Sequence, residues 1–293
     1  MPLFLRNKIL QVEIGVPGEF YTGSRFDYSG NIRQITYKNH TFCTTEKNNY
    51  SPVFGFGLLN EFDIESPAGY SEAKPKELFL KIGVGSLQKE DEQPYSFQLD
   101  YKNQPLAFEM ITTGETALEY KSKSPLVAGY QMQYTKELAI LKNKLIISYF
   151  LKNTGGKSFE TEEYCHNFLA IDQQKIGPDY GLNFDFNLQP DQFSELVNPA
   201  ETLSVARKQI GWNKIPSDDF FISTLNGNER IQASWKLVNN RMKAGVCEHT
   251  DFISHKINLW GNNHVVSPEL FFRVHLSPGE EARWQRIFTF FET

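Results

Sequence analysis

The stretch at residues 162–172, EEYCHNFLAID, sets a histidine among acidic and aromatic side chains in a run that is typical of a β-strand. In a strand, alternate side chains share a face. One face would carry Glu162, Tyr164, His166, Phe168 and Ala170, and the other Glu163, Cys165, Asn167, Leu169 and Ile171. The second face is the more aliphatic after Asn167, so we expect it to face the core. His166 is then left on the opposite face, between two aromatic residues.

A sheet face that displays His166 with aromatic rings and carboxylates has the chemistry of a sugar-binding surface. Aromatic rings stack on the C–H faces of pyranoses, and polar groups hold the hydroxyls. Histidine also titrates near neutral pH, so His166 could exchange protons with a bound sugar. The alternative is a partly exposed strand histidine with no chemical role, and this stretch alone does not decide between them.

A second set with possible chemistry is a candidate metal site. Cys247, His249 and Asp251 alternate in GVCEHTDF, with His255 nearby. Such donors can bind transition metals. No CxxC, HxH or HExxH spacing accompanies them, so we expect no metal site.

Nucleophile and nucleotide motifs are weaker still. No GxSxG elbow occurs, and Cys165 directly follows Tyr164 and precedes His166, so its thiol points away from the imidazole. We expect Cys165 to be a small core residue. The pairs Gly55-Phe56-Gly57 and Gly83-Val84-Gly85 lack the third glycine and following helix of a pyrophosphate site, and instead indicate strand bends or close backbone packing.

The elements that must position these residues are predicted to be strands. Apolar runs separated by turn-forming residues include LFLKIGV (78–84), KLIISYFL (144–151), RIQASWKLV (230–238) and LFFRVHL (270–276). We expect about fifteen to eighteen strands, short helical turns only at 190–196 and 60–66, and a polar loop at 63–76. Strands do not alternate with helices, so the prediction is an all-β antiparallel sandwich, with one domain over residues 1–293.

Composition supports a protein with a sizeable core. Of the 293 residues 40% are hydrophobic and 14% aromatic, and the net charge is −5. No basic block forms a nucleic-acid footprint, and no stretch approaches the roughly 18 apolar residues of a membrane span. The N-terminus has no signal-peptide pattern, and three cysteines argue against a disulfide framework. We therefore expect a cytoplasmic protein that binds neither nucleic acid nor membrane.

Both ends of the chain are similar to a known family. SPELFFRVHLSPGEEARWQRIFTFF (267–291) and ILQVEIGVPGEFYTGSRFDYSGNIRQITYKN (9–39) resemble the closing and opening strands of aldose 1-epimerases and other galactose mutarotase-like proteins. Residues 162–172 fall where that family has its catalytic histidine strand. The family's His-Ser/Thr-Tyr-Phe-Asn sequence is present only as His166-Asn167-Phe168, and its His-Gly segment has no clear counterpart. The chain thus looks like a divergent member.

The resemblance implies a galactose mutarotase-like supersandwich of antiparallel strands with a polar concave face and few short helices. It also implies an enzyme that interconverts the α and β anomers of a sugar or sugar phosphate by acid–base catalysis. The partner would be a small-molecule carbohydrate, with no cofactor and no metal. A non-catalytic carbohydrate-binding domain and a glycosidase or lyase on the same fold are the alternatives, and a homodimer stays open.

The resemblance also assigns roles to particular residues. His166 takes the acid role by its motif position, and Glu269, in Ser-Pro-Glu ahead of the closing strands, takes the base role. Glu248 is the competing base, whereas Glu280 in the Pro-Gly-Glu turn is expected to be structural. The expected substrate contacts are Arg25, Glu61, Lys81, Asp219 (or its neighbour Asp218), Trp260 and His264.

Overall fold

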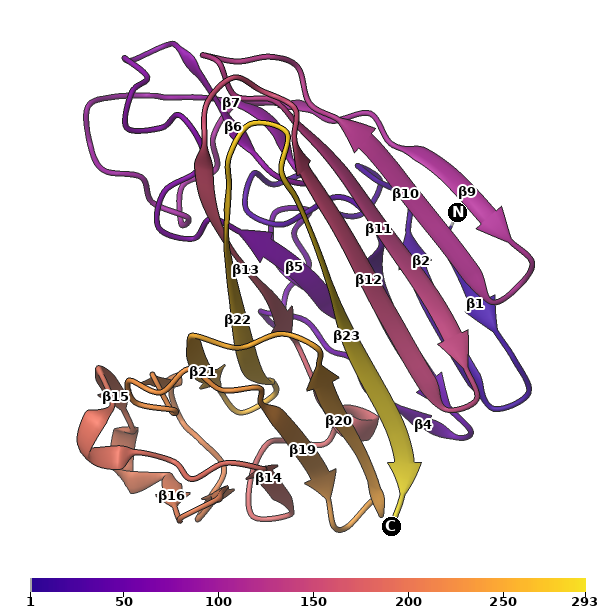
Figure 1. Ribbon diagram of the computed structural model, residues 1–293. Coiled ribbons are helices and arrows are strands. Elements are labelled where there is room, and N and C mark those ends of the chain that lie inside the picture. Colours follow the sequence, from indigo (N-terminus) through magenta and orange to yellow (C-terminus); the bar gives the residue numbers. More distant parts are fainter. Residues whose placement is uncertain (1) are drawn as a thin grey trace.

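The alternating runs of the sequence form two large antiparallel sheets, stacked as layers, and a small third sheet (Figure 1). The computed structural model describes residues 2–293. The first sheet has ten strands, in the order β1 (Leu3–Arg6), β2 (Leu10–Gly15), β3 (Asn31–Tyr37), β5 (Leu58–Phe62), β13 (Phe159–Asn167), β22 (Val266–Leu276), β21 (Lys256–Gly261), β18 (Phe220–Ser223) and β15 (Glu195–Val197), with β4 (His40–Thr41) paired to β3.

The second sheet also has ten strands, and the third has three. The order in the second is β16 (Leu203–Val205), β17 (Gln209–Trp212), β14 (Tyr180–Phe184), β19 (Ser234–Asn239), β20 (Ala244–Thr250), β23 (Glu281–Glu292), β12 (Lys144–Asn153), β11 (Met132–Leu141), β10 (Ala117–Lys123) and β9 (Glu109–Thr113). The third sheet is β6 (Leu78–Lys81), β7 (Gly85–Gln88) and β8 (Asn103–Pro105). Three 3₁₀ helices are present in residues 2–293: η1 (Ile171–Gln173), η2 (Pro190–Gln192) and η3 (Pro199–Glu201).

The main core lies between the two large sheets. Strands β11 and β12 bury every second side chain, as their alternating sequences predict. Rings from opposite sheets pack edge to face there, with Phe42 against Phe290 at 4.8 Å and Phe62 against Tyr134 at 5.4 Å between centroids. The prediction of an all-β antiparallel sandwich is confirmed.

A second apolar cluster covers part of the other face of the first sheet. Its rings come from several segments: Tyr21 and Phe26 from the β2–β3 loop, Phe79 from β6, Tyr101 from the loop before β8, and Phe168 from the residue after β13. Strands β5 and β13 are consequently buried on both faces over nearly their whole length. This double burial removes the hydrophobic alternation from LLNEF (58–62), because both faces are then apolar or paired. The predicted helical turn at 60–66 is therefore wrong, since most of its first half belongs to β5.

Two other predictions, of a turn at 190–196 and a loop at 63–76, agree with the structure. The turn at 190–196 is confirmed in its first residues by η2, and residues 63–76 form a loop between β5 and β6. The 23 strands in the described part of the chain exceed the expected number, because pieces as short as β4, β8 and β16 are too short to carry a pattern. Within residues 2–293 no helix has the length and apolar character needed to cross a membrane.

The paired glycines at 83 and 85 serve the β6–β7 hairpin, as expected of backbone positions rather than phosphate loops. Both have positive φ, at +74° and +148°. A Cβ on Gly83 would lie 2.5 Å from the Asp27 carboxylate, and one on Gly85 only 2.1 Å from the Gln104 carbonyl oxygen. Close approach and backbone conformation both require glycine here.

An arginine buried between the sheets joins three strands. Arg286 of β23 is fully buried and binds Glu163 of β13 at 2.8 Å and Glu248 of β20 at 2.7 Å. It also donates to the Leu270 carbonyl oxygen of β22, at 2.8 Å. Glu163 and Glu248 are each further bound by a tryptophan N–H, so both carboxylates have several donors in the dry core.

We predict that Arg286→Met destabilises the fold by about 3–5 kcal/mol, because it leaves two buried carboxylates without their cation. Urea denaturation followed by tryptophan fluorescence measures the loss. Arg283→Met, on the same strand but with its side chain 71% exposed, is the matched control and should change stability by less than about 0.5 kcal/mol. Equal effects of the two substitutions would contradict the role assigned to Arg286.

Candidate active site

The pairing of β13 with β22 brings His166 opposite Glu269. The ladder runs from Phe159↔Leu276 to Glu163↔Phe272, and the same register resumes at Leu169↔Val266. Continuing that register through the gap places His166 across from Glu269. Directly opposite residues of an antiparallel pair project from the same face of the sheet. Two residues distant in sequence thus become neighbours.

Pro268 lies within the gap in the ladder. Its carbonyl oxygen points to β13 and accepts from the Asn167 side-chain amide at 2.6 Å, so its nitrogen faces β13 as well but has no hydrogen to donate. The Asn167 backbone N–H instead donates to the Ser267 hydroxyl at 2.9 Å. Side-chain hydrogen bonds therefore hold the two strands together where the site lies.

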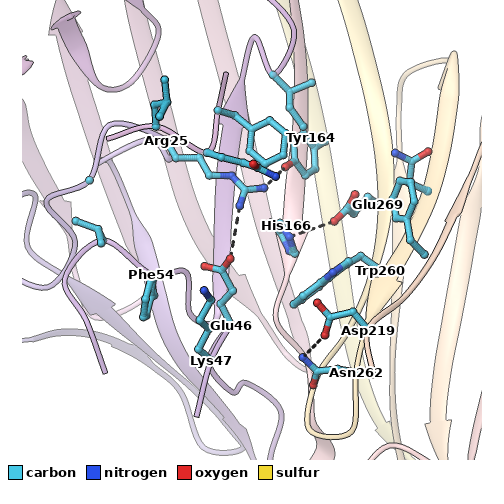
Figure 2. Close-up of a pocket in the computed structure, with 18 of the residues that line it drawn as sticks. Arg25, Glu46, Lys47, Phe54, Tyr164, His166, Asp219, Trp260, Asn262 and Glu269 are labelled. Carbon is cyan, nitrogen blue, oxygen red and sulfur yellow. Dashed lines mark hydrogen bonds and ion pairs between the residues drawn. The ribbon is translucent and has the colours of Figure 1, made fainter. Parts of the chain in front are cut away.

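The Ser267 hydroxyl links the histidine to the glutamate. Its oxygen lies 3.0 Å from His166 Nδ1 and donates to Glu269 Oε1 at 3.0 Å. A hydroxyl has one hydrogen to donate and can accept two. With Asn167 N–H as one donor, the network is complete when His166 Nδ1–H is the other. His166 Nε2 is then an unprotonated acceptor, 3.5 Å from Glu269 Oε1, and Figure 2 shows the two side chains pointing toward each other.

Aromatic rings enclose the imidazole of His166. Phe168 stacks on it with centroids 4.0 Å apart, and Trp260 and Phe26 meet it edge-on at 5.3 and 6.0 Å. This burial, reinforced by the nearby Arg25 charge, holds the pKa of His166 well below its ordinary 6.5. The imidazole is therefore neutral at physiological pH.

The same burial has the opposite effect on the carboxyl group of Glu269. It raises the pKa of Glu269 to about 8, against the opposing pull of the Ser267 hydrogen bond and the Arg25 charge. Glu269 is thus mostly protonated near pH 7 while His166 is neutral. One exchangeable proton is therefore shared between Glu269 and His166 Nε2. A paired acid and base require one such proton.

Arg25 lies on the cleft wall, bound by several groups. Its Nε donates to Glu61 Oε2 at 2.8 Å and its Nη2 to the Tyr164 hydroxyl at 3.1 Å. Glu46 approaches its Nη1 at 3.7 Å (Figure 2). Behind it, buried Lys81 lies 3.5 Å from Glu61 and donates to a tyrosine hydroxyl. Burial lowers the pKa of Lys81, with Glu61 opposing that shift.

An open cleft of about 1120 Å³ contains most of the predicted site. Of the expected residues, those on its wall are Arg25, His166, Asp219, Trp260, His264 and Glu269. Glu61 and Lys81 are not on the wall, and lie behind Arg25 as its support. Asp219 accepts from Asn262 at the rim, at 3.2 Å (Figure 2).

The competing assignments lie elsewhere. Glu248 is buried between the sheets, bound to Arg286, so it does not reach the cleft and the expectation that it competes as base is wrong. Glu163 points to the same inner side, and Cys165 is a core residue as expected. Asp218 does not line the cleft and accepts from Ser217.

Metal ligation finds no support in residues 2–293, where no group of three or more His, Cys, Asp or Glu side chains could hold a metal ion. Cys247 and His249 lie on β20 of the second sheet. His255, expected near them, instead bonds Glu162 at 2.5 Å, on the first sheet.

The sequence pattern does not indicate several of the residues that line the cleft. Ser267 stands in the Ser-Pro-Glu already singled out, but nothing in that tripeptide indicates that its hydroxyl bridges an acid and a base. Glu46, Lys47 and Phe54 come from the long loop between β4 and β5, which has no periodic pattern. Only the folded position of that loop reveals them.

Comparison with known proteins finds likeness in structure but not in sequence. No protein-family model matches the chain, and no curated protein matches its sequence. A galactose mutarotase related enzyme from Lactobacillus acidophilus superposes with a TM-score of 0.65 at 12% identity, covering 100% of this chain and 98% of that one. A galactose mutarotase-like protein from Lactobacillus casei gives 0.63 at 10% identity, covering 99% and 100%.

A third structure agrees with these two. An aldose epimerase homologue from C. elegans gives a TM-score of 0.56 at 11% identity, covering 100% of this chain and 99% of that one. Each likeness extends over the whole chain, and at these identities it concerns the fold alone.

We predict that Glu269→Gln gains stability relative to the unmodified protein as pH rises from about 5 to about 8. An unfolded glutamate loses its proton near pH 4.5, whereas the folded Glu269 keeps it to about 8. Over that window the unfolded state binds fewer protons, so the native protein loses stability with rising pH, and glutamine removes that loss. Urea denaturation at both pH values measures the difference. Glu280→Gln, at a fully exposed turn, should show no such trend, and a trend equal to that of Glu269→Gln would contradict the assignment.

Proposed function

We propose that this chain, which has the galactose mutarotase-like fold, is an aldose 1-epimerase acting on a carbohydrate bound in the cleft. One observation carries the proposal. His166 and Glu269 lie 3.5 Å apart on the buried floor of an open cleft, where burial favours the neutral form of both side chains. An ion pair with a purely structural role would need neither a shared proton nor a cleft large enough for a ligand.

The chemistry is a pair of proton transfers. Glu269 takes the proton of the anomeric O1–H while His166 gives one to the ring oxygen, and the bond between C1 and the ring oxygen breaks. Rotation about the C1–C2 bond of the open-chain aldehyde and closure with the transfers reversed yield the other anomer. Atoms and charge balance with no further reactant, and the proposal requires no metal or cofactor.

The protonation state that burial favours fits one point of this cycle. Ring opening converts imidazolium and carboxylate into imidazole and carboxylic acid, and the latter pair is the form that burial favours at rest. To open a cyclic sugar with His166 as acid, the proton must return from Glu269. His166 Nε2, the unprotonated nitrogen, faces Glu269 Oε1 at 3.5 Å, so this return runs directly between the two side chains.

We predict that His166→Asn and Glu269→Gln each lower the anomerisation rate by about 10²–10⁴-fold, the usual contribution of a general acid or base. NMR exchange measurements over free hexoses, pentoses and their phosphates identify the substrate and give the rates. The double variant should be little worse than either single one, because the two groups act as a unit. Undiminished rates in both single variants would refute the mechanism.

The same measurements separate the alternatives. A sugar that binds by calorimetry but is not anomerised by the unmodified protein would indicate a non-catalytic carbohydrate-binding domain. Release of a second sugar from a glycoside would indicate a hydrolase, which needs a second carboxylate roughly 5–10 Å from Glu269.

We also predict a pH profile with a plateau through neutral pH. In the free enzyme kcat/KM follows the form with one proton on the pair. The lower limit of that form is the pKa of His166, which burial holds well below 6.5. Its upper limit is the pKa of Glu269, which burial raises to about 8. Above about 8 the rate should fall with rising pH, after correction for uncatalysed mutarotation. A corrected rate that climbs through pH 9 would contradict the shared proton.

A further inference from the structure

The wall of the cleft carries more negative than positive charge. Apart from Glu269, its charged groups are two cations and four carboxylates: Arg25, Lys47, Glu46, Asp100, Glu195 and Asp219. A dianionic phosphate entering this cleft would meet net repulsion, which salt screens only beyond about 8 Å at physiological ionic strength.

Neither cation is well placed to offset that repulsion. The guanidinium of Arg25 is already bound to Glu61 at 2.8 Å and approached by Glu46 at 3.7 Å. Its planar fork, which would otherwise grip a phosphate, is largely occupied by carboxylates of the chain itself. Lys47 is solvent-exposed, and its ammonium lies 4.6 Å from the centre of the Phe54 ring.

The cleft is also larger than a single sugar needs. Its volume of about 1120 Å³ exceeds the range of roughly 300–1,000 Å³ that encloses drug-sized ligands, and a hexose is smaller than those. From the His166–Glu269 floor the wall continues past Trp260 to the Asp219–Asn262 pair at the rim (Figure 2). This path offers first an aromatic ring and then hydroxyl-binding groups, the combination that a second sugar would use.

The rim adds exposed apolar side chains. Leu99 and Val197 line the cleft and are 52% and 38% exposed. They stand on separate segments, the loop before β8 and the edge strand β15, so the apolar surface extends beyond the floor. Such surface suits the C–H faces of further sugar rings better than it suits a charged group.

We infer that the cleft accepts the reducing end of an uncharged oligosaccharide, with the reducing sugar at His166 and Glu269 and the next sugar along Trp260 and Asp219. The inference rests on the proposed anomerase function and specifies its substrate class. Phosphorylated sugars are disfavoured by the charge of the wall.

The test compares kcat/KM, by NMR exchange, for four substrates that share a reducing hexose. For glucose these are glucose, glucose 6-phosphate, and the disaccharides maltose and cellobiose; another hexose found active takes its own set. We expect the 6-phosphate to be poorer than the free hexose, and at least one disaccharide to stay within tenfold of it or exceed it. A 6-phosphate as good as or better than the hexose, or disaccharides all more than tenfold poorer, would overturn the inference.

A charge variant tests the cause. Asp219→Asn should raise kcat/KM for the 6-phosphate relative to the hexose by about two- to fivefold at low salt, and the gain should shrink as salt screens the removed repulsion. It should also weaken the disaccharide more than the hexose. Asp218→Asn makes the same charge change one residue away, outside the cleft, and is the matched control. Equal ratios in the two variants would contradict the inference.

Failure of the inference and failure of the proposed function are distinguishable. If no sugar of any set is anomerised, the function itself is wrong. If sugars are anomerised but the phosphorylated ones are preferred, the function stands and the inference is wrong.

Discussion

The structure depends on the buried guanidinium of Arg286. From the second sheet it binds Glu163 of β13, Glu248 of β20 and the Leu270 carbonyl oxygen of β22, and so ties the two central strands of the first sheet to the layer beneath. Taking one of these charges from water is costly unless every partner is present, so the network tolerates little displacement. These bonds from the second sheet hold the register of β13 against β22, close to the point where the ladder between the two strands is interrupted.

The register of β13 against β22 brings the residues of the site together. Because side chains alternate along a strand, the inward Glu163 and the cleft-facing His166 belong to the same strand but to different environments. Pro268 removes one ladder hydrogen bond, and Asn167 and Ser267 replace it with side-chain bonds. The interruption puts a hydroxyl between an imidazole and a carboxyl group. A regular ladder would have left Ser267 without the backbone N–H that it now accepts.

Burial then sets the protonation of the pair. The rings of Phe168 and Trp260 exclude water from His166, and the same apolar floor disfavours a carboxylate at Glu269. Both groups are pushed toward their neutral forms, which lowers one pKa and raises the other. The arrangement costs folding stability at neutral pH, since an exposed glutamate would be ionised there. It leaves a single mobile proton where a sugar ring can reach it.

Periodicity by itself determined the all-β class, the inward position of Cys165 and the cleft-facing position of His166, because a period of two specifies which face a side chain takes. The resemblance of the two chain ends added the supersandwich and named His166 and Glu269 as partners. Tertiary structure alone decided that Glu269 and not Glu248 lies across from His166, that Glu61 and Lys81 stand behind Arg25, that residues 58–62 form a strand, and that Ser267 bridges the pair. The physical reason is that strand neighbours in these sheets come from distant parts of the chain. A local pattern specifies which side chains of a strand share a face. The partner strand is decided only when the whole chain packs together.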